Sequence, residues 1–355
     1  MNKICDLPYS EIEIDRLGNL VDPLSLDNIA PAENLFVMVH GWNSNIDQAR
    51  ALYTDLFAQV SRTRQAHGSP APCAVLGILW PSEKCAPAAL IPGGAACLDP
   101  RVQREFVANL RALLPAQPDD EGARELLAMD GADLLGSVEG GAARVGGRIA
   151  QIRHTIEMLI NLSTYHLMKG RAGVVGRTGL ARTLDQIQDD FPGIRIHLIG
   201  HSFGCRTITA AAAAVRTPVA SMTLLQAAFS HNSFSPDGGF RSVVTDAKCE
   251  GPIVITHSVK DEAVGLCYPI ASRILRQSAS SFGGANDRYG ALGRNGARHT
   301  PEASDGDLLP EGASYTFAPG RIYNLQADDI IEAHSDIVKP ETAWALLSAA
   351  GLAQL

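Results

Sequence analysis

Short, nearly continuous apolar runs recur along the chain and predict the strands of a sheet. They lie at residues 35–39, 73–80, 194–200, 220–229, 252–259 and 321–326. Runs of this length with little polar alternation are typical of strands that are buried on both faces. Helical stretches lie between several of them, for example at 47–60, 203–215 and 341–350. We therefore expect an α/β fold with a mostly parallel central sheet flanked by helices.

The series of strands is interrupted once, by a long helical and glycine-rich stretch. We expect residues 1–82 and 191–355 to form the core and residues 83–190 to form a mainly helical insertion. A cap over the carboxyl edge of the sheet is one interpretation of this insertion, and additional packing helices are the other. Residues 271–320, with many Gly, Ser, Asn and Arg, predict a second irregular segment at the surface.

Composition narrows the classes of partner. Hydrophobic residues make up 46% of the 355 residues and charged residues 19%, as in a soluble globular protein. The 30 Lys and Arg against 38 Asp and Glu give a formal charge of -8, which argues against nucleic acid as a partner. We expect neither a signal peptide nor a membrane span, because the first residues lack an apolar segment of the right length and no apolar stretch is long enough to span a bilayer.

The seven cysteines are scattered, without CxxC pairs or the spacing of zinc ligands. They predict reduced thiols and a cytoplasmic location, although export without an N-terminal signal leaves no trace in a sequence. No oligomeric state is predicted.

The stretch Gly200-His201-Ser202-Phe203-Gly204 joins a predicted strand to a predicted helix. The G-x-S-x-G pattern alone is weak, but this strand–turn–helix context is the one it needs. A turn this tight forces the serine backbone into a strained conformation, and the flanking glycines remove side chains that would clash. Ser202 is therefore the candidate nucleophile, and a glycine-rich turn without chemistry is the alternative.

A serine nucleophile needs a histidine base and an acid that orients the histidine. Asp261 follows the strand predicted at 252–259 and is the candidate acid, with the adjacent Glu262 as its competitor. His334 follows both the acid and the strand predicted at 321–326, and it is the candidate base. Together with the serine, these residues predict a Ser-His-Asp triad.

Such a site also needs two N–H donors for the oxygen that becomes negative in the transition state. The backbone N–H of Phe203 is one candidate, and that of Trp42 is the other. Gly41 allows the loop to approach the site closely, and we expect His40 to brace that loop by hydrogen bonding. His201 is expected to pack beside the turn.

With these motifs the chain resembles the α/β-hydrolases, in particular their esterase and lipase-like branches. The resemblance rests on His40-Gly41-Trp42, Gly200-His201-Ser202-Phe203-Gly204, Asp261 with Val264, and His334. It covers roughly residues 33–80 and 190–350, and residues 11–21 are a candidate for an early strand. It implies the α/β-hydrolase fold, with an eight-stranded sheet whose second strand is antiparallel and a cap of variable form. It also implies that no metal or cofactor is needed.

The resemblance implies acyl transfer, in which Ser202 attacks a carbonyl, His334 takes its proton and Asp261 orients the imidazole. The leading interpretation is hydrolysis of a small-molecule or lipid carboxylic ester. A lipase or phospholipase acting on longer chains is one alternative, and a catalytically silent binding protein of the same fold is another.

Tyr165, Lys169 and Arg171 lie in a stretch that combines aromatic, sulfur and basic side chains. They are candidate substrate-binding residues, because a cation there would meet a carboxylate or phosphate. The alternative is a helix C-terminus whose basic residues interact with the helix dipole.

Overall fold

The computed structural model describes residues 3–29, 32–42, 44–82, 168–261, 263–264 and 290–354. The chain divides into two units, the first of which comprises Met1–Glu83, Met168–Pro269 and Ala279–Leu355. All the residues that the structure describes belong to this first unit. Residues 168–190, which we expected in the insertion, lie in it as well. The rest of the insertion is outside the described residues, so a cap remains a prediction.

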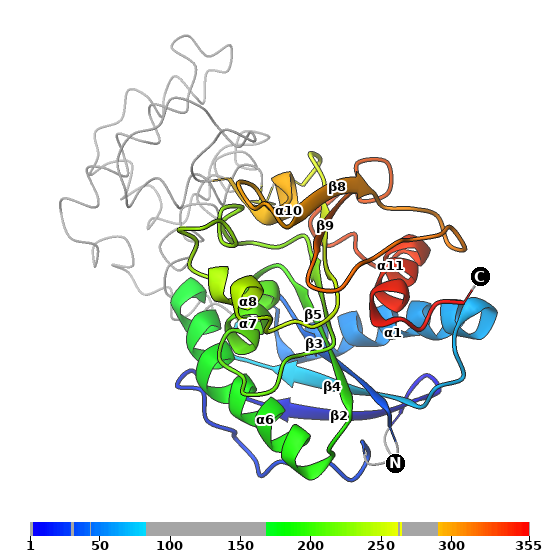
Figure 1. Ribbon diagram of the computed structural model, residues 1–355. Coiled ribbons are helices and arrows are strands. Elements are labelled where there is room, and N and C mark those ends of the chain that lie inside the picture. Colours follow the sequence, from blue (N-terminus) through cyan, green and yellow to red (C-terminus); the bar gives the residue numbers. More distant parts are fainter. Residues whose placement is uncertain are drawn as a thin grey trace, which may run out of the picture. The chain divides into compact units, whose positions relative to one another are not determined.

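The described residues form a nine-stranded, almost wholly parallel sheet (Figure 1). Its strands, in spatial order, are β1 (Lys3–Ile4), β2 (Leu7–Glu13), β4 (Cys73–Leu79), β3 (Asn34–Val39), β5 (Arg195–His201), β6 (Ser221–Leu225), β7 (Ile253–His257), β9 (Ile322–Gln326) and β8 (Ala303–Asp307). Each neighbouring pair is parallel except β1 and β2. The predicted α/β fold is therefore confirmed.

The sheet departs from the eight strands that the resemblance implies. The second strand, β2, is antiparallel to β1 but parallel to β4, and it begins at Leu7 rather than in the stretch 11–21. The segment 271–320, expected to be irregular, contains β8 and the short helix α10 (Leu292–Asn295). The sequence of β8, Ala-Ser-Asp-Gly-Asp, has no apolar pattern because this edge strand is largely exposed and is held by its ladder to β9.

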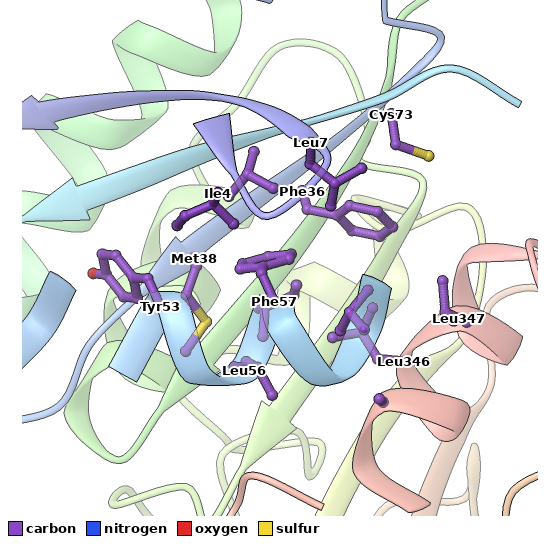
Figure 2. Packing of buried hydrophobic residues seen from close by; sticks show 14 of the residues in the cluster. Ile4, Leu7, Phe36, Met38, Tyr53, Leu56, Phe57, Cys73, Leu346 and Leu347 are labelled. Atoms are coloured by element: carbon purple, nitrogen blue, oxygen red, sulfur yellow. The ribbon is translucent and has the colours of Figure 1, made fainter. Parts of the chain in front are cut away.

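Two helices pack on one face of the sheet, α1 (Ile46–His67) and α11 (Pro340–Ala350). Figure 2 shows Tyr53 and Phe57 of α1 facing Phe36 and Met38 of β3, all fully buried. Such burial contributes about 1.5–3 kcal/mol for each large apolar side chain. The core on this face thus fixes α1, whose first turn directly follows the loop after β3.

The other face is covered by α7 (Phe203–Ala212) and α6 (Ala181–Asp190), and a π-helical turn, η2 (Val175–Leu180), runs directly into α6 (Figure 1). Gly176 of η2 packs closely on α7, since a Cβ there would lie 2.2 Å from the carbonyl oxygen of Thr207. A further short helix, α8 (Arg241–Thr245), precedes β7. In the part of the chain that the structure describes, no helix is long and apolar enough to cross a membrane.

The register of the central strands determines which loops meet. Val39, the last residue of β3, pairs with Gly200 of β5, and His201 pairs with Leu225 of β6. Since parallel strands end at the same edge, the loops that follow β3, β5 and β6 emerge side by side. Ligands of open α/β sheets bind at this carboxyl edge, which is also where the candidate residues lie.

Candidate active site

Ser202 occupies a sharp turn between β5 and α7, and its backbone is strained. Its φ of 56° and ψ of -121° lie in a region that residues with a side chain rarely adopt. The turn is held by the N–H of Ser202, which donates to Leu225 O, and by the N–H of Ala228, which donates to Ser202 O. The strain is therefore fixed by the surrounding structure.

Both glycines of the motif are required by close approaches. A Cβ on Gly200 would lie 2.6 Å from the Cα of Cys205, inside the turn itself. A Cβ on Gly204 would lie 2.1 Å from the carbonyl oxygen of Val39 at the end of β3. Real Cβ atoms do not come this close to a backbone oxygen, so only glycine lets α7 begin against β3.

His334, in the loop between β9 and α11, contacts the serine directly. Its Nε2 lies 2.8 Å from Ser202 Oγ, and its Nδ1 lies 2.8 Å from Oδ2 of Asp261. A carboxylate only accepts hydrogen bonds, so Nδ1 of His334 carries a proton, and in this tautomer Nε2 can accept from the serine hydroxyl. Ser202 then donates to Nε2. Three residues distant in the sequence are thus joined in one hydrogen-bonded chain.

Asp261, in the loop after β7, is fully buried, and both oxygens of its carboxylate accept hydrogen bonds. Its Oδ1 accepts from the N–H of Val264 at 3.2 Å, and its Oδ2 accepts from His334 and from Nε2 of Gln226, the latter at 3.0 Å. Burial by itself would raise the pKa of this carboxyl group. The hydrogen bonds and the charge interaction with His334 outweigh burial and lower the pKa of Asp261 below its usual value. The carboxylate therefore stays ionised at neutral pH.

His201 connects the turn to the loop that carries His334. Its Nε2–H donates to the backbone oxygen of His334 at 2.8 Å, and the two ring centroids are 4.9 Å apart. Burial, followed by the electrostatic influence of His334, lowers the pKa of His201 to about 3. The ring is therefore neutral at physiological pH, and its donating nitrogen is fixed by the carbonyl it meets.

The loop after β3 comes close to the serine. A Cβ on Gly41 would lie 2.8 Å from the Cβ of Ser202, so a larger residue does not fit there. The rings of Trp42 and Phe203, whose N–H groups are the candidate donors, lie side by side with centroids 5.8 Å apart. Trp42 in the loop after β3 thus contacts Phe203, the first residue of α7, which directly follows the serine.

His40 makes hydrogen bonds that hold this loop in place. Its Nδ1–H donates to Gly41 O at 2.9 Å, while its Nε2 accepts from the N–H of Trp80 at 3.3 Å. Its own N–H donates to the hydroxyl of Tyr53, which donates in turn to Ile78 O. Burial lowers the pKa of His40 to about 4, so this ring is also neutral and can serve as both donor and acceptor.

Of the three candidate substrate-binding residues, the structure describes Lys169 and Arg171. Tyr165 lies outside the described residues. Arg171 donates from Nη1 to Pro81 O at 2.5 Å, just beyond β4, and the backbone oxygen of Lys169 accepts from Nε of Arg206 at 3.0 Å. These contacts tie the start of this helical segment to β4 and α7, and a role in substrate binding stays a prediction.

Sequence reasoning missed the contribution of Gln226 and Ser258. Gln226 was read as part of an apolar strand over 220–229, whereas β6 ends at Leu225 and the glutamine side chain reaches Asp261. Ser258 donates from Oγ to Ile331 O at 2.8 Å and so links the loop of the acid to the loop of His334. Gln226, a polar residue inside an otherwise apolar run, was the available signal for the first, and Ser258 gave none because other polar residues adjoin it.

The arrangement provides a hydroxyl beside an imidazole that is oriented by an ionised carboxylate. Groups placed in this way can move a proton from the hydroxyl to the ring, and the carboxylate stabilises the resulting positive charge. Among the described residues, no three His, Cys, Asp or Glu side chains are grouped so that they could hold a metal ion.

Comparison with known proteins agrees with this architecture. A family model for the alpha/beta hydrolase fold matches residues 165–244, which include β5, the turn at Ser202, α7 and β6. No curated protein matches the chain. The family match favours a hydrolase. Taken together with the nine-stranded sheet, it shows that the chain has an α/β-hydrolase fold and supports its place in the α/β-hydrolase superfamily.

Proposed function

We propose that this protein is a serine hydrolase that cleaves carboxylic esters through an acyl-enzyme intermediate. The observation that carries the proposal is the hydrogen-bonded chain from Ser202 Oγ through His334 to Asp261, with 2.8 Å at each step. A strained serine, an imidazole and an ionised carboxylate in this order are the arrangement that activates a hydroxyl. A structural role for the same contacts would not require strain at the serine.

In the proposed mechanism Ser202 Oγ attacks the ester carbonyl while its proton passes to Nε2 of His334. Asp261 holds the imidazole in the required tautomer and stabilises its positive charge. The backbone N–H groups of Trp42 and Phe203 donate to the oxyanion of the tetrahedral intermediate, a contribution of about 3 kcal/mol per donor. His334 then protonates the departing alcohol and activates the water that releases the acid.

Hydrolysis of nitrophenyl esters tests this proposal. The series runs from acetate to palmitate, with wild type compared to Ser202→Ala and to Ser25→Ala, which changes an exposed serine between β2 and β3 that hydrogen-bonds only to Asp27 among the contacts described. We expect wild type and Ser25→Ala to turn over equally, and Ser202→Ala to lose at least about 10⁴-fold in kcat. The acyl chain length that is cleaved fastest distinguishes an esterase from a lipase.

Turnover that survives in Ser202→Ala would contradict the assigned nucleophile. Absence of turnover in wild type with every ester, including esters in lipid micelles, would favour a binding protein with this fold over an esterase.

A further inference from the structure

Gln226, the residue that follows β6, is strained and fully buried. Its φ is 47°, in the left-handed region that glycine favours, and its side chain is completely covered. A non-glycine residue in this conformation destabilises the fold and persists where the surroundings determine it fully. Burying an amide adds a further cost unless each of its polar atoms is hydrogen-bonded. Both features call for an explanation.

The hydrogen bonds of Gln226 fix the orientation of its amide without ambiguity. Nε2 donates to Oδ2 of Asp261 at 3.0 Å and to Gly293 O at 3.3 Å, and both of these atoms are acceptors only. Oε1 accepts from Oγ1 of Thr256 at 3.1 Å, and this hydroxyl in turn accepts from the N–H of Gln226. The nitrogen must therefore face the carboxylate, with both of its protons used.

The oxygen that Gln226 meets is the one that also accepts from Nδ1 of His334. Two donors from different elements thus converge on Oδ2, while Oδ1 is occupied by the N–H of Val264. The amide prevents the carboxylate from rotating about its Cβ–Cγ bond and keeps Oδ2 directed at the imidazole. It also stabilises the ionised form, since hydrogen bonds to a carboxylate favour its charge.

We propose that Gln226 is a positioning residue that holds Asp261 in the orientation needed to align His334. The inference rests on the proposed function, because alignment matters only if His334 acts as a base. It explains why strain is retained at the end of β6, and why α10 is packed so closely there. A Cβ on Gly293 of α10 would lie 2.4 Å from the backbone carbon of Gln226, so that only glycine brings this acceptor to the amide.

The substitution Gln226→Glu tests this role, because it keeps the shape of the side chain and replaces the amide donor with a carboxyl group. We expect kcat for ester hydrolysis to fall about 10- to 100-fold with little change in KM, as for a misaligned catalytic group. The acid limb of the pH profile changes, because two buried carboxyl groups this close titrate as a coupled pair. Titratable groups that interact with Asp261 include His334 and the neutral His201.

Two further variants separate positioning from folding. Gln65→Glu makes the same change on the exposed end of α1 and should leave kcat and the pH profile as in wild type. Thr256→Val removes the anchor of the amide oxygen without touching Asp261, and it should lower kcat less than Gln226→Glu does.

A second measurement does not depend on turnover. The proton between Nδ1 of His334 and Asp261 gives a low-field proton NMR signal, assigned by its loss in His334→Ala. We expect this signal to shift or vanish in Gln226→Glu and to remain in Gln65→Glu. If wild type cleaves no ester but the signal responds in this way, the proposed function fails and the positioning role stands. An unchanged signal together with unchanged kcat in a folded Gln226→Glu would overturn the positioning role.

Discussion

His201 lies next to Ser202, yet its side chain serves the loop of a residue much farther along the chain. Its Nε2–H donates to the backbone oxygen of His334, 133 positions away. Because burial keeps the ring neutral, with a pKa of about 3, this contact adds no positive charge next to His334. The ring thus fixes the position of the proposed base without opposing its protonation during the reaction.

Replacing His201 with Phe should therefore impair alignment rather than binding. Phe fills most of the space but leaves the oxygen of His334 without this donor, so we expect kcat to fall about 10-fold or more with KM nearly unchanged. His201→Gln retains an N–H donor and should recover part of the loss. Steady-state ester kinetics of the three proteins make the comparison, and equal kcat for wild type and His201→Phe would refute the role.

For individual residues, the sequence allowed prediction of those that directly follow apolar runs. Ser202, Asp261 and His334 could be singled out because each follows a predicted strand, and the structure brings all three together. The bond from Gln226 to Asp261 could not be predicted, because it spans 35 positions and depends on where β6 ends. Residue types and order are visible in a sequence, whereas the orientation of a buried amide is a product of packing.

Among the elements, the contact between the start of α7 and the end of β3 determines the geometry of the site. Gly204 lies against the carbonyl oxygens of Val39 and His40, where a Cβ would come within 2.1 and 2.6 Å respectively. The same contact sets the distance between the loop of Gly41 and the turn at Ser202. Any side chain at position 204 must therefore displace one element from the other.

We expect Gly204→Ala to lower the free energy of unfolding by several kcal/mol, as other strained or overpacked core substitutions do, and to reduce ester turnover in the protein that folds. Gly239→Ala is the matched control, because a Cβ there meets nothing within 4 Å. Urea denaturation and ester kinetics on both variants test this. A fully stable and active Gly204→Ala would show that the contact is looser than described.

Prediction of elements succeeded where burial imposes a pattern. The central strands β3, β4 and β5 are mostly apolar and almost wholly buried because helices cover both faces, and α1 begins at a capping box formed by Asn45 and Gln48. The strand β8 was not predicted, because an exposed edge strand needs no apolar residues and is specified by its pairing with β9. The apolar pattern of a segment shows which of its side chains are buried. Pairing between strands leaves no comparable pattern in the sequence.

Across the molecule, several histidines are buried in neutral form, and this links stability to pH. Burial lowers the pKa of His40 to about 4, and those of His197 and His201 to about 3, against about 6.5 in an unfolded chain. Below pH 6.5 the unfolded chain binds protons that the folded protein excludes. Their contribution to stability is therefore complete above pH 6.5 and is lost progressively as the pH falls toward the folded values.

His197 allows this to be tested away from the proposed site. It lies in β5, where Nε2–H donates to Oδ1 of Asn34 and Nδ1 accepts from the hydroxyl of Ser221. His197→Gln removes the titrating group. We expect the free energy of unfolding of this variant to fall less steeply between pH 6.5 and 4.5 than that of wild type, by a difference that approaches about 1.4 kcal/mol per pH unit at the acid end. Parallel slopes from urea titrations would mean that His197 takes up a proton in the folded state.

The most direct test of the whole account is covalent labelling with a fluorophosphonate, which reacts with activated serines. We predict a single adduct by intact mass, placed on Ser202 by peptide mapping and absent from Ser202→Ala. Labelling should be slowed at least about 100-fold in His334→Ala, because the general base is removed. An adduct on another residue, or a wild-type protein that stays unlabelled, would contradict the claim that His334 and Asp261 activate Ser202.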